Sequence, residues 1–366
     1  MKKLGFGAMR LPHMSKDGEW VIDMELTKNM VDTFIEGGFT YFDTAWMYCN
    51  GKSEEAMKEA LVDRYPRDSF TLATKIPSYM IKSFEDREWL FNEQLRRTGA
   101  GYFDYYLVHD VNSKSIETFN KFDCFSFVRE KKEQGLAKKI GFSFHDGPEL
   151  LDKVLTEHPE MEFVQLQINY LDWESSSVQS RACWEVAKKH GKDIIVMEPV
   201  KGGGLATISD EYAHPFKEYD PDMSVASWAI RFAAGLDNVF MVLSGMSNME
   251  QLCDNMGFMS DFKPLTKEET GIVYHVADLL MGMTEVPCTA CEYCIVNCPS
   301  NISIPKLFAL YNKDLKEERN TYKGEFDELV KSSGAPSECI ECGQCEAMCP
   351  QHIKIIENLK KVAERF

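Results

Sequence analysis

The chain has 366 residues, with 41 Lys and Arg against 58 Asp and Glu, for a formal net charge of −17 at pH 7. A hydrophobic content of 44% excludes a disordered or fibrous chain, and the acidity argues against nucleic acid as a partner, because phosphate binding needs clustered Lys and Arg. The length exceeds the roughly 250 to 300 residues at which a single core stops growing, which predicts more than one structural unit.

Short, β-rich apolar runs recur along residues 1–265, with segments of helical periodicity between them. The predicted strands are residues 4–8, 40–42, 70–74, 105–108, 140–142, 163–166, 194–197 and 239–243. The predicted helices are residues 25–36, 54–64, 85–97, 117–134, 149–157, 179–190 and 224–234. Alternating buried strands and helices predict a parallel sheet, and eight units in about 260 residues favour a closed (β/α)8 TIM barrel. An open doubly wound sheet is the alternative, although GFGAMR at the first strand lacks the third glycine of a dinucleotide-binding GxGxxG turn.

The pattern changes after Lys267. A helix over 267–281 leads through Pro287 into the first of two cysteine clusters, and a polar helical insert over 306–331 separates the two clusters. The sequence therefore predicts a barrel over 1–265, a connecting helix and linker over 266–287, and a small, mainly helical cysteine domain over 288–366.

The longest apolar stretch, near residues 225–246, is interrupted by Arg231 and Asp237. It therefore falls short of the roughly 20 apolar residues that a membrane helix needs. The beginning of the chain, MKKLGFGAM, has no apolar region of signal-peptide length. We expect a cytoplasmic protein without a membrane span, whose thiols are kept reduced.

Eight of the 12 cysteines lie between residues 288 and 349, where one spacing occurs twice. The run CxxCxxCxxxCP begins at Cys288 and again at Cys339, so that every cysteine is displaced by 51. Three thiolates at this spacing converge on three corners of a cubane, and the fourth comes from elsewhere. The segment resembles two-cluster ferredoxins, in which the fourth cysteine of each run ligates the other cluster. The resemblance implies two [4Fe-4S] clusters, one held by Cys288, Cys291, Cys294 and Cys349, and the other by Cys339, Cys342, Cys345 and Cys298.

Zinc and disulfides are the alternatives for these cysteines. Thiolates at CxxC spacing also suit tetrahedral zinc, but a zinc ribbon has two CxxC pairs on separate knuckles. The absence of a signal sequence disfavours a disulfide framework. The remaining Cys49, Cys124, Cys183 and Cys253 are expected to be ordinary buried or surface thiols.

Four chemically active side chains follow three successive predicted strands, at the C-terminal ends where barrels of this kind place catalytic groups. They are Asp43 in FTYFDTAWMY, Tyr48 in the same segment, Lys75 in TLATKIP and His109 in DYYLVHD. A phenol is a poor acid at neutral pH unless a nearby cation stabilises the phenolate, and a carboxylate can hold that cation in place. The set predicts proton transfer by Tyr48, with Lys75 held by Asp43 and with His109 orienting a carbonyl oxygen.

At these residues the first 265 positions resemble the aldo/keto reductase superfamily. Further matching segments are GGFTYFDTA, GKSEEAMKEAL, KIGFS, VQLQINYLD and SGMSNMEQLCDN. The resemblance implies that Asp43, Tyr48, Lys75 and His109 form a catalytic tetrad, and that hydride passes between a nicotinamide and a carbonyl carbon. With the cysteine domain added, the whole chain resembles aldo/keto reductases fused to a C-terminal two-cluster 4Fe-4S ferredoxin-like domain, recognisable also by FGAMRLP and VMEPVKGGGL.

The same resemblance implies cofactor contacts. Ser143 and Gln165, together with Asn169, occupy positions that hold the nicotinamide amide. The glycine-rich loop over 197–205 would let backbone amides approach a pyrophosphate. The full expected set is Met9, Arg10, Asp43, Ser143, Gln165, Asn169, Met197, Pro199, Gly202, Gly245, Gln251 and Asn255.

Two departures from the family pattern bear on the cofactor. Met197 stands where many members stack an aromatic ring on the nicotinamide. Gly245 and Gln251 stand where many NADPH users place Lys and Arg. NADPH, NADH and a flavin are therefore all admissible.

Three functions stay open. The first is an oxidoreductase that reduces a small-molecule carbonyl or quinone-like substrate, with clusters that serve structure or electron exchange. The second is an electron-transfer protein that passes single electrons to a redox protein partner, since carbonyl reduction by hydride needs no cluster. The third is a non-catalytic sensor or assembly protein, against which the intact tetrad argues.

Overall fold

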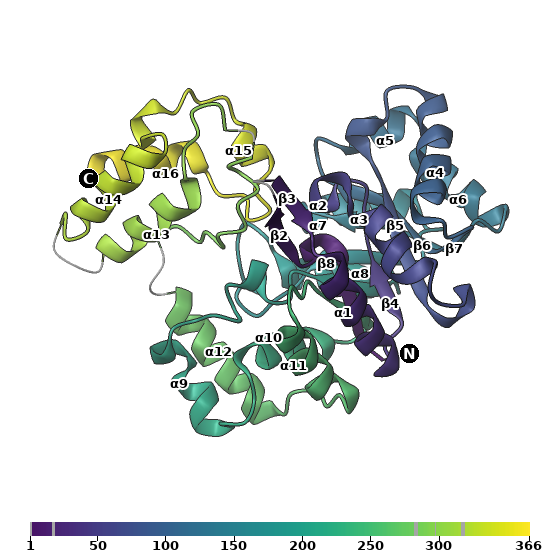
Figure 1. The fold of residues 1–366 in the computed structure, drawn as a ribbon, viewed down its shortest axis with the longest axis horizontal. Coiled ribbons are helices and arrows are strands. Elements are labelled where there is room, and N and C mark those ends of the chain that lie inside the picture. The colour runs from purple at the N-terminus through teal and green to yellow at the C-terminus, as the bar shows by residue number, and fades with distance from the viewer. Residues whose placement is uncertain (1, 17–18, 282–284, 297, 316–318) are drawn as a thin grey trace.

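The computed structural model describes residues 2–16, 19–281, 285–296, 298–315 and 319–366. In this part of the chain eight parallel strands close into a barrel (Figure 1). Around the barrel they are β1 (Leu4–Gly7), β10 (Val239–Ser244), β9 (Asp193–Met197), β8 (Phe163–Gln167), β7 (Ala137–Phe144), β6 (Phe103–Val111), β5 (Thr71–Pro77) and β4 (Tyr41–Asp43). The closed order confirms the (β/α)8 prediction over the open sheet, and each predicted strand overlaps one of these eight.

Helices surround the barrel at most of the predicted places. They are α1 (Met24–Glu36), α3 (Ser53–Met57), α4 (Phe84–Thr98), α5 (Ile116–Lys121), α6 (Cys124–Glu133), α7 (Pro148–Glu157), α8 (Ser180–Lys189) and α10 (Val225–Ala234). The prediction of a single helix over 117–134 is wrong. The segment is divided into α5 and α6 because Asp123 adopts a left-handed backbone with φ of 50°, and a right-handed helix cannot continue through such a residue.

Other elements were not predicted. A short antiparallel hairpin of β2 (His13–Lys16) and β3 (Glu19–Ile22) follows β1. Helix α2 (Tyr48–Gly51) follows β4, and the outer helices α9 (Asp210–Tyr219) and α11 (Met249–Ser260) complete the barrel. The sequence pattern is weak at the hairpin because its first strand is exposed along its whole length and so shows no alternation of buried and exposed positions.

The interior of the barrel is filled by apolar side chains from the strands: Tyr41, Ala73, Leu107, Phe163, Ile195, Met241 and Leu243. Gly141 makes room for this layer, because a Cβ there would lie 2.8 Å from the ring of Phe163. A filled interior is a packed core and not a pore. Chemistry is therefore confined to the C-terminal ends of the strands.

Helix α12 (Lys267–Met281), which was predicted as a connection, packs against α9 and α10. Its Val273, Val276 and Ala277 are part of the barrel's apolar core. None of the helices in the described ranges is long and apolar enough to cross a membrane.

The cysteine domain forms a separate group of helices beside the barrel, in the yellow-green colours of Figure 1. Its helices are α13 (Ile304–Asp314), α14 (Lys323–Ser332), α15 (Gln344–Ala347) and α16 (Ile355–Arg365), and they enclose an apolar core of their own. Residues 282–284 of the predicted linker and 316–318 of the predicted insert lie outside the described residues.

Candidate active site

A cavity of about 850 Å³ opens at the C-terminal ends of the barrel strands, a volume within the range of small-molecule sites. Of the predicted site residues, it is lined by Met9, Arg10, Asp43, Tyr48, His109, Gln165, Met197, Pro199, Gly202, Gly245 and Gln251. One wall comes from the cysteine domain and consists of Tyr293, Glu346, Ala347, Met348, Cys349, Pro350 and His352. Lys75, Ser143, Asn169 and Asn255 are buried and stand outside this lining.

Asp43 and Lys75 form a buried ion pair on adjacent strands. Asp43 ends β4, and the parallel register sets it beside Ala73 of β5, two positions before Lys75. Lys75 Nζ lies 2.5 Å from Asp43 Oδ1 and donates to the Thr44 carbonyl oxygen at 2.8 Å. Burial lowers the pKa of Lys75 and raises the pKa of Asp43, and in each case the partner's charge opposes that shift. The mutual attraction of the two charges therefore opposes the cost of burying each of them.

Tyr48 meets this pair from the turn after β4. Cys49 and Asn50 take left-handed backbone angles there, with φ of 53° and 55°. Lys75 Nζ lies 4.8 Å from the centre of the Tyr48 ring. The Tyr48 and His109 rings lie 6.1 Å apart and nearly perpendicular. The structure therefore brings the four predicted tetrad residues together.

The pKa of Tyr48 differs from expectation. The sequence predicts that a cation favours the phenolate, yet burial raises the pKa of Tyr48 well above its usual value, and Asp43, Tyr293, Glu198 and Asp110 raise it further. The physical reason is that Lys75 is paired with Asp43, while several acidic groups face the phenol. Tyr48 therefore holds its proton at neutral pH.

His109 lies near the end of β6 and is buried beside the tetrad. Burial lowers the pKa of His109 well below its usual value, and Lys75 and His145 lower it further. The imidazole is therefore neutral at pH 7. A neutral imidazole has one N–H donor and one acceptor nitrogen, so His109 can hold a carbonyl oxygen by a hydrogen bond.

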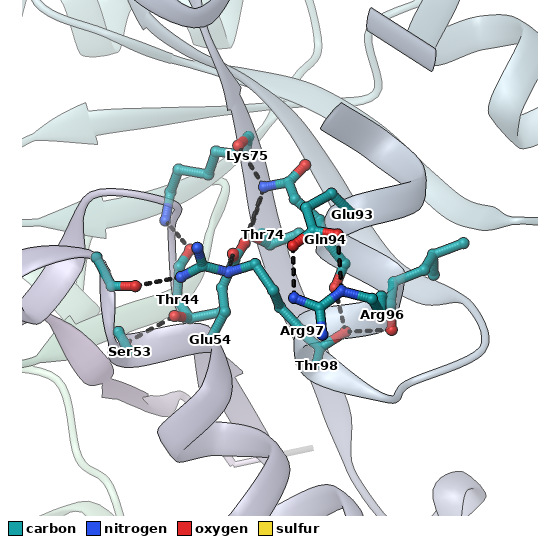
Figure 2. Close-up of polar contacts among 12 residues, drawn as sticks. Thr44, Ser53, Glu54, Thr74, Lys75, Glu93, Gln94, Arg96, Arg97 and Thr98 are labelled. Carbon is teal, nitrogen blue, oxygen red and sulfur yellow. Dashed lines mark hydrogen bonds and ion pairs between the residues drawn. The ribbon is translucent and has the colours of Figure 1, made fainter. Parts of the chain in front are cut away.

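Figure 2 shows a buried polar network that joins the Lys75 strand to α3 and α4. Glu54 Oε1 accepts from Thr74 Oγ1 at 2.7 Å and from Gln94 Nε2 at 2.8 Å. Gln94 Nε2 also donates to the Lys75 carbonyl oxygen at 2.9 Å. The second carboxylate oxygen, Glu54 Oε2, lies 2.9 Å from Arg97 Nε.

Arg97 carries the network to the Tyr48 turn, because its Nη2 donates to the Gly51 carbonyl oxygen. The network therefore positions both Lys75 and Tyr48 without touching the cavity. Sequence reasoning found the segment GKSEEAMKEAL but assigned Glu54 no role, since a lone glutamate on a helix resembles an ordinary exposed one.

Arg10 points a buried donor toward the glycine-rich loop after β9. Its Nη2 is buried without a hydrogen-bond partner among the described residues. A Cβ on Gly202 would lie 3.5 Å from this atom, and a Cβ on Gly245 would lie 3.2 Å from Arg10 Cδ. Gly202 also has a positive φ of 65°, which favours glycine. Because the two glycines have no side chain, the Arg10 guanidinium can occupy the space beside them. A free guanidinium N–H suits a phosphate oxygen.

Gln165 is the predicted amide contact that reaches the cavity. Its Oε1 is buried and has no hydrogen-bond partner within the described ranges, while its Nε2 lies 3.5 Å from Met197 Sδ. An amide ligand could therefore donate to Gln165.

Three other predicted contacts are already engaged behind the cavity wall. Ser143 Oγ accepts from the Asp110 amide at 2.8 Å. Asn169 Nδ2 donates to Asp172 Oδ2 at 2.7 Å and to the Glu198 carbonyl oxygen at 3.1 Å. Asn255 Nδ2 donates to Ser244 Oγ at 2.7 Å. The structure does not bring Ser143, Asn169 and Asn255 to the cavity, and their contact with a cofactor stays a prediction.

The eight clustered cysteines surround two small, mostly apolar cavities in the cysteine domain. Thiol site one is lined by Cys288, Cys291, Cys294 and Cys349, and thiol site two by Cys339, Cys342, Cys345 and Cys298. These are the two sets that the ferredoxin resemblance implies. Four thiols around each cavity are a donor set that suits an iron–sulfur cluster. Cys349 lines thiol site one and the barrel cavity as well.

The junction between barrel and cysteine domain is a buried polar contact that no sequence signal indicated. Lys201, only 5% exposed, donates from Nζ to Asp172 Oδ1 of the barrel and to Gln351 Oε1 of the cysteine domain. Nearby, the Tyr293 hydroxyl lies 3.1 Å from Met9 Sδ. These contacts seat the cysteine domain on the mouth of the barrel.

Family profiles match both parts of the chain. The profile of the Aldo/keto reductase family matches residues 3–278, and the profile of a 4Fe-4S dicluster domain matches residues 287–353. An uncharacterized oxidoreductase of Bacillus subtilis (strain 168) is 24% identical over 272 residues, which cover 66% of this chain and 84% of that protein. A 9,11-endoperoxide prostaglandin H2 reductase of Trypanosoma cruzi (strain CL Brener) is 25% identical over 271 residues, which cover 74% and 85%.

Solved structures share the barrel. An aldo-keto reductase of Bacillus halodurans in its holo form superposes with a TM-score of 0.58 at 23% identity, covering 75% of this chain and 91% of that one. An aldo-keto reductase of Klebsiella pneumoniae in complex with NADPH gives 0.58 at 18% identity, covering 75% and 90%. At these identities the likeness shows the fold alone.

Proposed function

Because the chain belongs to the aldo/keto reductase family and carries a C-terminal 4Fe-4S dicluster domain, we propose that it transfers hydride between a nicotinamide cofactor and a small-molecule carbonyl or alcohol, with Tyr48 as the general acid. The observation that carries the proposal is the convergence of Tyr48, His109 and the Lys75–Asp43 pair at one end of the barrel cavity.

A bound nicotinamide would supply the hydride, and bound clusters would supply one-electron transfer. Tyr48, protonated in its buried setting, gives its proton to the carbonyl oxygen. The Lys75 charge, 4.8 Å from the ring centre, attracts the phenolate that is left, although the pairing with Asp43 weakens this attraction. Asp43 keeps Lys75 in place. Neutral His109 orients the carbonyl oxygen through its N–H group. Such a placed acid contributes about 10² to 10⁴ in rate.

Arg10, Gly202 and Gly245 would hold the pyrophosphate of the cofactor, and Gln165 would accept from the nicotinamide amide. The support is the unpartnered Arg10 Nη2 beside the two glycines, together with the unpartnered Gln165 Oε1 in the described chain. Neither Gly245 nor Gln251 brings a positive charge to the cavity. We therefore expect NADH to bind at least as tightly as NADPH.

Two [4Fe-4S] clusters would occupy thiol sites one and two, and the cluster in site one would exchange electrons with the barrel site. The supporting observation is that Cys349 lines both the barrel cavity and thiol site one. The same observation favours a second candidate function, an electron-transfer protein in which the barrel holds a nicotinamide or a flavin and the clusters serve a redox protein partner.

The test of the first function is anaerobic turnover. Purified protein with both clusters should oxidise NADH or NADPH in the presence of an aldehyde, ketone or quinone from a broad panel. Tyr48→Phe should lower kcat by about 10² to 10⁴, whereas Tyr219→Phe, on the outer helix α9, should leave it unchanged. Equal activity of Y48F and wild type would sink the general-acid role.

Cluster content and spectra separate the two candidates. About eight irons per chain are expected for two cubanes, with about four lost in Cys291→Ser or Cys342→Ser and none in Cys253→Ser. Rapid bleaching of the cluster absorption by NADH without a carbonyl substrate, together with an extractable flavin, would favour electron transfer. Carbonyl turnover that leaves the cluster absorption untouched would favour the simple reductase.

A further inference from the structure

Thiol sites one and two are related position by position through the internal repeat of 51 residues. Cys288 corresponds to Cys339, and Cys349 to Cys298. The apolar lining follows the same rule, because Ile353 in site one corresponds to Ile302 in site two. Because the two linings correspond so closely, a polar side chain that is present in one cavity and absent from the other distinguishes how the two cavities can bind their contents.

The match fails at three polar positions of site one. At one of them the exposed Glu292 has Gly343 as its counterpart, and the other two carry buried donor atoms. Site one is lined by Thr289 and Gln351, whereas site two has Ile340 and Ser300 at the corresponding places. Ile340 has no donor, and Ser300 Oγ already donates to the Glu338 carbonyl oxygen at 2.8 Å. In contrast, Thr289 Oγ1 and Gln351 Nε2 are buried without a hydrogen-bond partner in the part of the chain that the structure describes. Site one therefore has two buried donors available that site two lacks.

The contact with Lys201 fixes the orientation of the Gln351 amide. An ammonium group can only donate, so the atom that it contacts must be the amide oxygen. Gln167 Nε2 approaches the same oxygen at 3.5 Å. The amide nitrogen of Gln351 is then the atom that does not contact Lys201. Because Gln351 lines thiol site one but not the barrel cavity, this nitrogen is available to thiol site one. Lys201 is itself fixed by Asp172.

Thr289 lies on the barrel side of thiol site one. A Cβ on Gly202 would lie 3.2 Å from Thr289 Oγ1, so glycine at position 202 leaves the hydroxyl its room. An unpaired buried donor costs free energy, and two such donors in one four-thiol cavity indicate an acceptor that belongs there. The cluster that we propose for this cavity has sulfur atoms that accept hydrogen bonds.

We infer that Thr289 and Gln351 donate hydrogen bonds to the cluster in thiol site one and set its reduction potential above that of the cluster in site two. Gln351 is held in place by Lys201, which acts as a positioning residue from the barrel. The physical reason is that reduction adds negative charge to the cluster, so hydrogen-bond donors stabilise the reduced form more than the oxidised form. Electrons would then settle on the cluster beside the barrel cavity. The inference rests on the proposed cluster content of the two sites.

The test is a redox titration of the full chain with both clusters loaded, followed by electron paramagnetic resonance under anaerobic conditions. Thr289→Val removes only the hydroxyl, and Gln351→Leu removes the amide. Each should lower the higher of two one-electron potentials and leave the lower one in place. We expect reduction of that cluster to become roughly tenfold less favourable, which is about 59 mV for one electron.

The repeat supplies matched controls. Ser300→Ala, whose hydroxyl is already engaged by Glu338, should move neither potential. Ile340→Thr places a hydroxyl in site two at the position of Thr289, and it should raise the lower potential. Lys201→Met should lower the higher potential, because Gln351 loses the contact that orients it.

The inference is overturned if both potentials keep their wild-type values in T289V and Q351L. It is also overturned if T289V and Q351L move the lower potential, which I340T is expected to move. T289V and I340T change no charged contact and keep the test valid if Q351L fails to fold. Iron analysis distinguishes a failure of the proposed cluster content from a failure of this inference. A wild-type chain without iron after reconstitution contradicts the proposed clusters, whereas full iron content with unmoved potentials contradicts only the assignment of Thr289 and Gln351.

Discussion

Lys75 Nζ lies 2.5 Å from Asp43 Oδ1, and their side chains are 0% and 2% exposed. Two adjacent strands of the barrel bring these opposite charges together at the floor of the cavity. Removing one partner would leave the other charged and buried, which costs more than the attraction of the intact pair contributes. The pair is therefore a structural feature of the barrel as well as a part of the proposed proton transfer.

Asp43→Ala should lower the free energy of unfolding by about 3 to 5 kcal/mol, because Lys75 then has no counter-charge. The double variant D43A/Lys75→Met should lose less than D43A alone, since no charge stays buried. Denaturant unfolding followed by circular dichroism gives both values. As a control, Lys188→Met removes the exposed pair with Asp237 and should change stability by less than about 1 kcal/mol. A double variant less stable than D43A would contradict the account.

Arg97 and Arg96 are neighbours in α4, but their substitution should cost very different amounts of stability. Arg97 pairs with the fully buried Glu54 and holds the turn after Tyr48, so Arg97→Met should cost about 3 to 5 kcal/mol and should also lower kcat. Arg96 pairs with Glu93 and is 66% exposed, so Arg96→Met should cost less than about 1 kcal/mol. Stability and kcat are measured side by side. Equal losses in the two variants would show that the buried network does not support the site.

Acid should destabilise the barrel through His109 and His145. Burial lowers the pKa of both groups, with Lys75 acting on His109 and with His352 and Asp110 acting in opposite directions on His145. In the unfolded chain each imidazole binds a proton below about pH 6.5, so the unfolded state holds more protons and stability falls as pH falls below that value.

The slope of the unfolding free energy against pH should approach about 1.4 kcal/mol per pH unit for each of these two histidines. Above about pH 6.5 both states are neutral, and these two groups should add no slope. His109→Gln should reduce the slope between about pH 6.5 and 5, whereas His13→Gln, on the exposed strand β2, should keep it. An unchanged slope in H109Q would show that His109 does not lose its neutral form on unfolding.

Arg10→Met should weaken dinucleotide binding roughly tenfold, because a hydrogen bond to a charged group is worth about 1.5 to 3 kcal/mol. NADH and NADPH should be affected alike, since the pyrophosphate is common to both. Quenching of protein fluorescence gives the dissociation constants. Arg64→Met, at the surface pair with Asp32, is the control. A loss confined to NADPH would instead place Arg10 at the 2′-phosphate.

Much of the barrel could be predicted because its strands are buried on both faces and read as apolar runs. The helix predicted over 117–134 was wrong because Asp123 leaves the helical backbone, and nothing in the apolar pattern marks that residue. The tetrad could be placed because parallel strands end at the same rim. The pKa direction of Tyr48 could not be predicted, since it depends first on the burial of the phenol and then on Asp43 and on Tyr293, Glu198 and Asp110 from other elements.

By itself, the sequence determined the eight-unit alternation, the four tetrad candidates and the cysteine repeat, because each is a local pattern of residue types at regular spacing. Only the tertiary structure decided that the cysteine domain forms a wall of the barrel cavity, that Glu54 supports Lys75, and that Lys201 meets Gln351 across 150 positions of chain. Such contacts depend on how separate elements pack, and a single buried Lys, Glu or Gln looks the same in a sequence as an exposed one.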